Sequence, residues 1–183
     1  MGYTVLVQYR STLIESTQGL NIMTSNALSE GNFFASKNSG KAHKAFYATV
    51  DKYDEYNLIN VIGLFRGEVD GLKTVMLELH DAKSIKSGDK YKIKNYQDPD
   101  IKVSVWYSES MFENGWHVNS GELTIENYDL PNEHIKVTFE FSVTSESGKK
   151  AVIKGYADLT DFSENSSLPE DIQKGFKLRE ARK

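Results

Sequence analysis

The most informative absence from this chain is cysteine, of which its 183 residues contain none. Without a thiol the chain can form no disulfide, no thiolate metal site and no covalent intermediate on cysteine. It also lacks the lipidated cysteine that a lipoprotein anchor requires. Cysteine-based stabilisation, metal binding, catalysis and lipid anchoring are therefore not expected.

Long hydrophobic runs are absent as well, since no stretch approaches the roughly 18 apolar residues of a transmembrane helix. Near the N-terminus, Gln8, Tyr9 and Arg10 interrupt the apolar stretch after Val7, which leaves it short of a secretory signal. Leu6 stands where a myristoylation motif needs Ser or Thr. We expect a soluble chain that is cytoplasmic, or exported without such a signal peptide.

An excess of charge of one sign is also missing, because 22 Lys and Arg stand against 26 Asp and Glu. Nonspecific nucleic-acid binding needs a clustered basic excess, so we expect no nucleic-acid partner. The aromatic share of 11% is high enough to build a hydrophobic core, which argues against disorder. The length is that of one well-packed domain.

Alternation of apolar and polar residues with period two dominates the chain and predicts β-strands. The clearest case is residues 134–144, HIKVTFEFSVT, in which every second side chain is apolar. Successive side chains of a strand point to opposite faces, so this run predicts one buried face. The buried residues of this strand would be Ile135, Val137, Phe139, Phe141 and Val143.

Other strands follow from similar patterns. Residues 58–66 are almost continuously apolar, as in a central strand buried on both faces, and a loop with two glycines joins them to the alternating run 73–79. Residues 122–127, 134–144 and 151–159 predict three consecutive antiparallel strands. The remaining predicted strands are 3–9, 45–50, and a pair formed by 91–95 and 101–107 around the turn YQDPD.

Two segments depart from this pattern. Residues 24–40 are rich in Ser, Asn and Gly, which predicts a long loop or a short helix. Residues 167–183 begin with Ser167, Pro169 and two acids and end with basic residues, which indicates a short C-terminal helix. We therefore predict an all-β domain over residues 1–166, an antiparallel β-sandwich or open barrel of roughly eight to ten strands, followed by a helical tail, 167–183.

Residues 120–159 (SGELTIENYDLPNEHIKVTFEFSVTSESGKKAVIKGYADL) carry a family resemblance, together with the upstream segments FYATV, IGLF and YKIKNY. Over residues 45–160 the pattern resembles uncharacterised bacterial β-sandwich domains, several of which occur on surface lipoproteins of Bacteroidetes. The chain departs from those proteins because it lacks their signal and lipidated cysteine. The resemblance implies a sandwich fold and brings no activity or site residues.

Catalytic and metal-binding patterns are not found in the sequence. There is no GxSxG nucleophile motif, and Ser120, which precedes Gly121, is explained by a turn before a strand. The four histidines are isolated, and neither Asp98 with Asp100 nor Asp158 with Asp161 has the spacing of a known calcium loop. No Walker or dinucleotide motif occurs. We expect a protein that is not an enzyme and needs no metal or cofactor.

The aromatic stretch 105–118, VWYSESMFENGWHV, is the best candidate for a binding site. Val105 and Tyr107 belong to the buried face of their strand, which leaves Trp106 on the opposite face as either a cross-strand partner or an exposed platform. Sugar-binding sandwiches stack rings on such side chains, and loops carry such sites. The predicted ligand-binding residues are Trp106, Phe112, Asn114, Trp116, His117 and Asn119.

The sequence thus favours a non-enzymatic binding protein that recognises a glycan or a protein partner through its loops. A second hypothesis is an effector or toxin exported without a leader, which would bind a membrane surface or a receptor and include pore-forming or insecticidal types. A cysteine-free, acidic, β-rich chain fits both. The oligomeric state is left open by the sequence.

Overall fold

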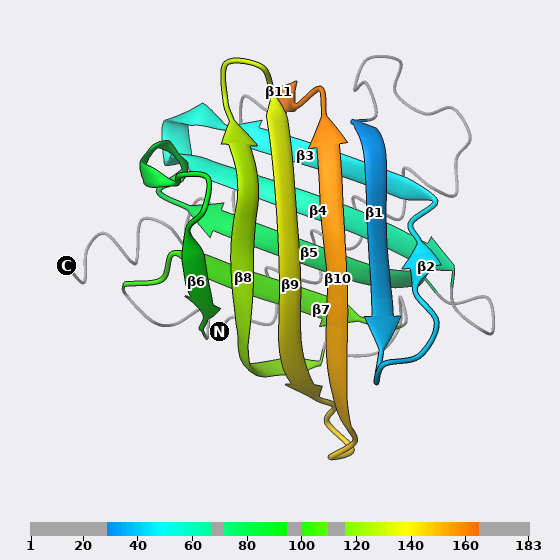
Figure 1. Ribbon diagram of the computed structural model, residues 1–183. Helices are drawn as coiled ribbons and strands as arrows, with labels where there is room; N and C mark the ends of the chain where they lie inside the picture. Colours follow the sequence, from blue (N-terminus) through cyan, green and yellow to red (C-terminus); the bar gives the residue numbers. More distant parts are fainter. Residues whose placement is uncertain (1–28, 67–71, 95–99, 110–115, 165–183) are drawn as a thin grey trace.

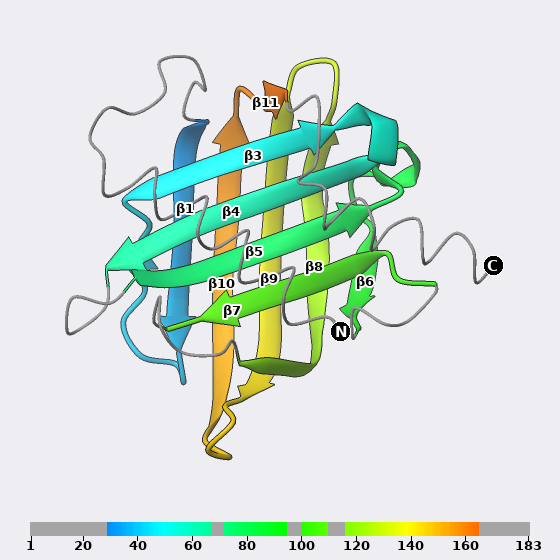
Figure 2. The same ribbon diagram turned by 180° about the vertical axis from the view of Figure 1, so that it is seen from behind.

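The computed structural model describes residues 29–66, 72–94, 100–109 and 116–164, and every strand and helix below lies in these ranges. They form two β-sheets that lie face to face, with strands that cross at a steep angle (Figures 1 and 2). This confirms the predicted all-β sandwich. The strand predicted at 3–9 and the helix predicted at 167–183 fall outside the described residues.

The six-stranded sheet, in front in Figure 1, and the five-stranded sheet, in front in Figure 2, are antiparallel apart from one short parallel pairing, β11 with β3. The first has the order β2 (His43–Lys44), β1 (Glu30–Lys37), β10 (Lys150–Thr160), β9 (His134–Thr144), β8 (His117–Asp129) and β6 (Lys90–Ile93). The second has the order β11 (Ser163–Glu164), β3 (Tyr47–Tyr53), β4 (Leu58–Arg66), β5 (Leu72–His80) and β7 (Val103–Ser108). The two described helices are short 3₁₀ turns, η1 (Asp54–Tyr56) and η2 (Ala82–Ser84), and no described helix could cross a membrane.

Strands β8, β9 and β10 form the predicted antiparallel meander. The alternation in β9 has the expected result, because all five of its predicted inward residues are buried. In β10, Ala151, Ile153, Ala157 and Leu159 are buried in the same way. The other side chains of these strands point away from the second sheet, so the outer face of the six-stranded sheet is polar and open.

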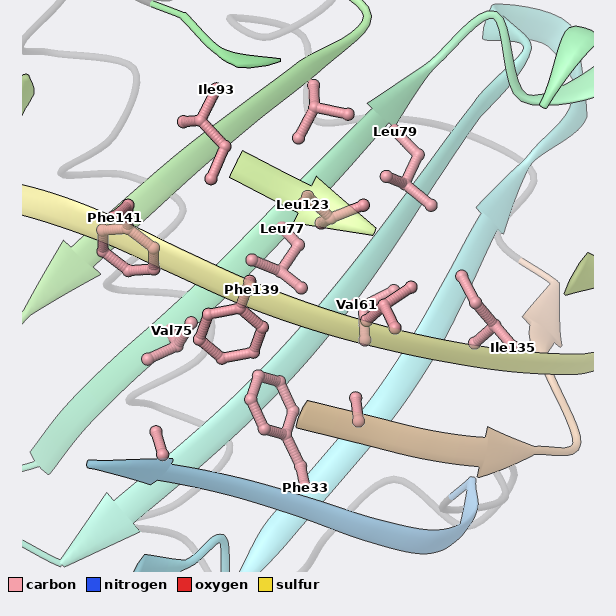
Figure 3. Close-up of a cluster of buried hydrophobic side chains, with 14 of the residues drawn as sticks. Phe33, Val61, Val75, Leu77, Leu79, Ile93, Leu123, Ile135, Phe139 and Phe141 are labelled. Carbon is pink, nitrogen blue, oxygen red and sulfur yellow. The ribbon is translucent and has the colours of Figure 1, made fainter. Parts of the chain in front are cut away.

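The core between the sheets is built from aromatic and aliphatic side chains of both sheets (Figure 3). Phe33 of β1, 1% exposed, packs edge-on against Phe65 of β4 and Phe139 of β9, with ring centroids 5.6 and 5.7 Å away. It also lies against Gly63, where a Cβ atom would stand 2.6 Å from its ring. Phe33 therefore joins the two sheets, and only glycine leaves room for its ring at position 63.

Strand β4 is buried on both faces, as its continuous apolar sequence predicts. Val61 and Phe65 face the six-stranded sheet, whereas Ile62 and Leu64 form a second cluster with Met76 on the opposite face. Half-buried Tyr47 and Trp106 pack against that second cluster. The five-stranded sheet thus carries apolar side chains on both of its faces.

The prediction of a loop or short helix for residues 24–40 is wrong for residues 30–37, which form β1. Only Phe33 and Ala35 of this strand face the core, so its polar composition hides the alternation. The strand is held by long-range pairing, since Phe33 lies opposite Ala157 of β10. Partners so distant in sequence leave no local signal.

The predicted pairing of 91–95 with 101–107 is also wrong. Strand β6 pairs with β8 in the six-stranded sheet, whereas β7 pairs with β5 in the five-stranded sheet. The chain between them passes from one sheet to the other. Both strands point apolar residues, Ile93 and Val103, into the shared core, and this burial decides where each strand lies.

The position of Phe33 between the sheets predicts a large effect of its truncation. Phe33→Ala should lower the free energy of unfolding by about 3–5 kcal/mol, because it leaves a cavity that the rigid strands cannot close. Phe46→Ala is the matched control, since Phe46 is 50% exposed and contacts the Arg66 guanidinium at 6.0 Å; it should cost less than about 1 kcal/mol. Equal losses in urea unfolding would contradict this description of the core.

Candidate functional site

The two tryptophans of the predicted binding loop do not form one platform. Trp106 lies on the outer face of the five-stranded sheet, half-buried against the cluster of Ile62, Leu64 and Met76. Trp116 is 7% exposed and belongs to the core between the sheets, where its ring packs edge-on against Tyr107 at 5.9 Å. A ring so deeply buried cannot stack on a ligand, so the hypothesis of a platform that includes Trp116 is wrong.

The remaining predicted residues are dispersed. Phe112 and Asn114 lie outside the described residues. His117 and Asn119 are exposed at the start of β8, where the Asn119 amide donates a hydrogen bond to the Thr144 hydroxyl at 2.9 Å. These two residues belong to the six-stranded sheet and Trp106 to the other sheet. The described members of the predicted set therefore do not share one site.

The burial of Trp116 is explained by a charged corner that covers it. The Lys37 amine lies 4.7 Å above the Trp116 ring and forms an ion pair with Glu109 at 2.6 Å. The Tyr107 hydroxyl donates a hydrogen bond to the same carboxylate at 2.6 Å. Burial and this carboxylate raise the pKa of Tyr107 far above its usual value. Burial opposes ionisation of Glu109, but Lys37 and Tyr107 outweigh it and lower the pKa of that carboxyl.

A stacked aromatic pair, one ring exposed and the other half-buried, lies instead on the outer face of the six-stranded sheet. Phe34 of β1 and Tyr156 of β10 are direct cross-strand neighbours, and their rings stack with centroids 5.2 Å apart at an interplanar angle of 23°. Tyr156 is 39% exposed, which makes it one of two large exposed hydrophobic side chains among the described residues. The alternation of β10 predicts that Tyr156 points outward. Its partner Phe34 could not be predicted, because the sequence pattern does not indicate that β1 is a strand.

Polar groups surround this aromatic pair and are tied together in pairs. On one side, the Lys154 amine forms an ion pair with Glu140 at 2.9 Å. On the other, Asp158 contacts His134 Nε2 at 2.8 Å. Next to the Lys154–Glu140 pair the face has a shallow depression, which is lined by Ser120, Gly121, Glu122, Glu140, Phe141, Ser142 and Val152. The pair therefore lies on an open face with hydrogen-bonding groups on both sides.

A row of polar side chains, which we call the polar row, lies on the outer face of the five-stranded sheet and was not predicted from the sequence. Asp51, Asn60, Glu78 and Ser104 are successive cross-strand neighbours on β3, β4, β5 and β7. The Ser104 hydroxyl donates a hydrogen bond to Glu78 and lies 3.1 Å from Nε2 of His80. The spacing Glu78-Leu79-His80 places the acid and the histidine on one face, which is the only local signal of this row.

This row does not have the order of a hydrolytic triad. In such a triad the histidine stands between the serine and the acid, so that it can accept the serine proton. Here Ser104 stands between the two, and His80 Nε2 is 3.9 Å from the Glu78 carboxylate. Ser104 is also only 2% exposed. Within the described ranges, this row included, no three His, Asp or Glu side chains gather closely enough to hold a metal ion.

Neither the family models, the curated proteins nor the solved structures compared with this chain gave a match. Of the two outer faces, that of the six-stranded sheet presents the exposed Tyr156 ring, stacked on half-buried Phe34, to solvent. The polar row of the other sheet includes side chains that are almost fully buried, among them Asn60 and Ser104. The outer face of the six-stranded sheet is the better candidate for a binding surface.

Asp51 gives the polar row a testable pH dependence. Burial raises the pKa of this carboxyl to about 6, although a hydrogen bond from the Thr49 hydroxyl at 3.1 Å acts in the opposite direction. The folded protein therefore binds more protons than the unfolded chain between about pH 4 and pH 6, and the free energy of unfolding falls as the pH rises through this window. The loss is at most ~3 kcal/mol.

Asp51→Asn should remove this loss, because the amide keeps the shape of the carboxyl without its charge. We expect a higher free energy of unfolding near pH 7, by up to ~3 kcal/mol, and a flatter pH profile in urea unfolding. Asp54→Asn is the control and should change little, because Asp54 is an exposed acid three residues further along the chain whose ion pair with Lys52 lies at the surface. An Asp51→Asn profile identical to that of the unmodified chain would show that Asp51 ionises normally.

Proposed function

We propose that this chain is a non-enzymatic glycan-binding protein whose recognition surface is the outer face of the six-stranded sheet. The proposal depends on one observation, the exposed Tyr156 ring stacked on half-buried Phe34 on an otherwise polar sheet face. Leaving large aromatic surface in water is unfavourable, so such a pair on an open face calls for a partner.

The chemistry around the pair suits a sugar. The C–H face of a sugar ring is apolar and slightly positive, which matches the negative face of an aromatic ring. The hydroxyl groups of a sugar need both donors and acceptors, and the Thr138 hydroxyl, the Lys154 amine and the Asp158 carboxylate offer both beside Tyr156. A few placed polar groups around an apolar contact are typical of ligand sites.

The pair is also rigidly placed. Tyr156 lies on β10, which is hydrogen-bonded to β1 on one side and to β9 on the other. Phe34 follows Phe33 directly, and Phe33 is fixed between the two sheets. A site on regular strands loses little conformational entropy when a ligand binds.

A protein partner suits this face less well. Specific protein interfaces have a central apolar patch that is depleted of charged residues. Here the aromatic pair stands between the Lys154–Glu140 ion pair and the hydrogen-bonded His134 and Asp158. Such a face fits a ligand that is itself covered with hydroxyl groups.

Tyr156→Ala should weaken glycan binding about tenfold or more, because the ring is the main apolar contact. Binding would be surveyed on a glycan array and measured by calorimetry with the best ligand. Phe46→Ala removes a ring that is even more exposed, from a different place, and should leave the affinity unchanged. Circular dichroism would establish that both variants are folded.

Two outcomes would contradict the proposal. In the first, the unmodified chain binds no glycan on a broad array. In the second, a glycan binds but Tyr156→Ala and Phe46→Ala have the same affinity as the unmodified chain. The second outcome would place a glycan site elsewhere on the molecule.

A further inference from the structure

The aromatic pair belongs to a longer row of outward-facing side chains that crosses the whole six-stranded sheet. Each member is the direct cross-strand neighbour of the next. The strands that carry the row lie side by side from β2 to β6 in Figure 1. The members, which we call the aromatic row, are Lys44, Phe34, Tyr156, Thr138, Thr124 and Lys90.

The aromatic row carries positive charge at both ends and contains no acid. Lys44 and Lys90 are exposed, and within the described residues neither amine forms an ion pair or a hydrogen bond with another side chain. In the neighbouring rows Lys154 is paired with Glu140 and Lys136 with Glu126, and Lys92 lies directly cross-strand from Glu122. The uncompensated charge of this part of the face is therefore concentrated at the two ends of the row.

The length of the row sets the size of its ligand. Neighbouring strands lie about 4.8 Å apart, so the five steps from Lys44 to Lys90 span about 24 Å along the sheet. Aromatic rings and hydroxyl groups fill the space between the two amines. A ligand that contacts every member must be extended and must lie across the strands.

We propose that the ligand is an extended anionic oligosaccharide that lies along the aromatic row. Its sugar rings stack on Phe34 and Tyr156 and hydrogen-bond to Thr138 and Thr124, and its carboxylate or sulfate groups meet Lys44 and Lys90. This inference rests on the proposed glycan binding and specifies its ligand class. Charge complementarity carries it, since a neutral chain would leave both amines without a partner.

Single-stranded nucleic acid is the other extended anion that stacks on aromatic rings. It carries a charge on every nucleotide and is bound by grooves with many basic side chains. The aromatic row has two lysines, and the whole chain has a net charge of −4. An oligosaccharide with few charges fits this distribution better.

The experiment compares four probes on the full chain by calorimetry at low and moderate salt. They are galacturonic acid oligomers, the same oligomers as neutral methyl esters, a sulfated oligosaccharide and single-stranded oligothymidylate. We expect the acidic oligomers to bind more tightly than their esters, with an advantage that shrinks as salt rises. Comparison of the carboxylated with the sulfated probe identifies which anionic group the lysines accept.

Lys44→Gln and Lys90→Gln should each weaken binding of the acidic oligomers about two- to fivefold and leave binding of the esters unchanged. Lys149→Gln, an exposed lysine in the loop between β9 and β10, is the control and should have no effect. The double variant should bind acid and ester equally, with little salt dependence.

The results separate this inference from the proposed function. If acid and ester bind equally and both lysine variants are unchanged, while Tyr156→Ala still weakens binding, the anionic ligand class is overturned and glycan binding stands. Tighter binding of oligothymidylate than of any oligosaccharide overturns the inference in favour of nucleic acid. If none of the oligosaccharide probes binds, this inference fails, and the proposed function fails with it only when the broad glycan array also shows no binding.

Discussion

The close approach of Phe33 to Gly63 is the contact on which the rest of this sandwich depends. The ring comes from the six-stranded sheet and fills space that position 63 leaves open in the other sheet, between Phe65 and Phe139. Because successive side chains alternate, burial of Phe33 forces Phe34 outward. Strand register then sets Phe34 opposite Tyr156. A packing constraint in the core thereby creates the aromatic pair on the surface.

The neighbouring strand is constrained in the same manner. A Cβ atom at Gly155 would lie 2.2 Å from the carbonyl oxygen of Phe34 and 2.5 Å from the Phe139 ring. Glycine at this position lets Phe139 fill the core beneath β10 while β1 and β10 stay in contact. Tyr156 follows Gly155 and points to solvent, because successive side chains of a strand lie on opposite faces. The two glycines, 63 and 155, therefore determine how closely the layers pack and where the exposed rings stand.

Much of the fold could be predicted from local pattern, but the candidate site could not. The burial of β9 and β4 can be predicted from their own sequences. Strand β9 alternates apolar and polar residues, and β4 is continuously apolar. Strand β1 contributes few inward side chains, and its neighbour β10 is more than 100 residues away, so no window of sequence reveals it. The aromatic composition of residues 105–118 suggested a binding site, yet Trp116 is a core residue. Composition identifies aromatic residues, and only register shows which of them meet on a surface.

The central claim is that the outer face of the six-stranded sheet is a recognition surface centred on Phe34 and Tyr156. The most direct test is chemical-shift mapping by NMR, in which the labelled chain is titrated with acidic oligosaccharides. The account predicts that the largest changes follow the aromatic row, at Phe34, Tyr156 and Thr138, and spread to both ends of the row. Changes confined to the five-stranded sheet or to His117 and Asn119, or no changes at all, would contradict it.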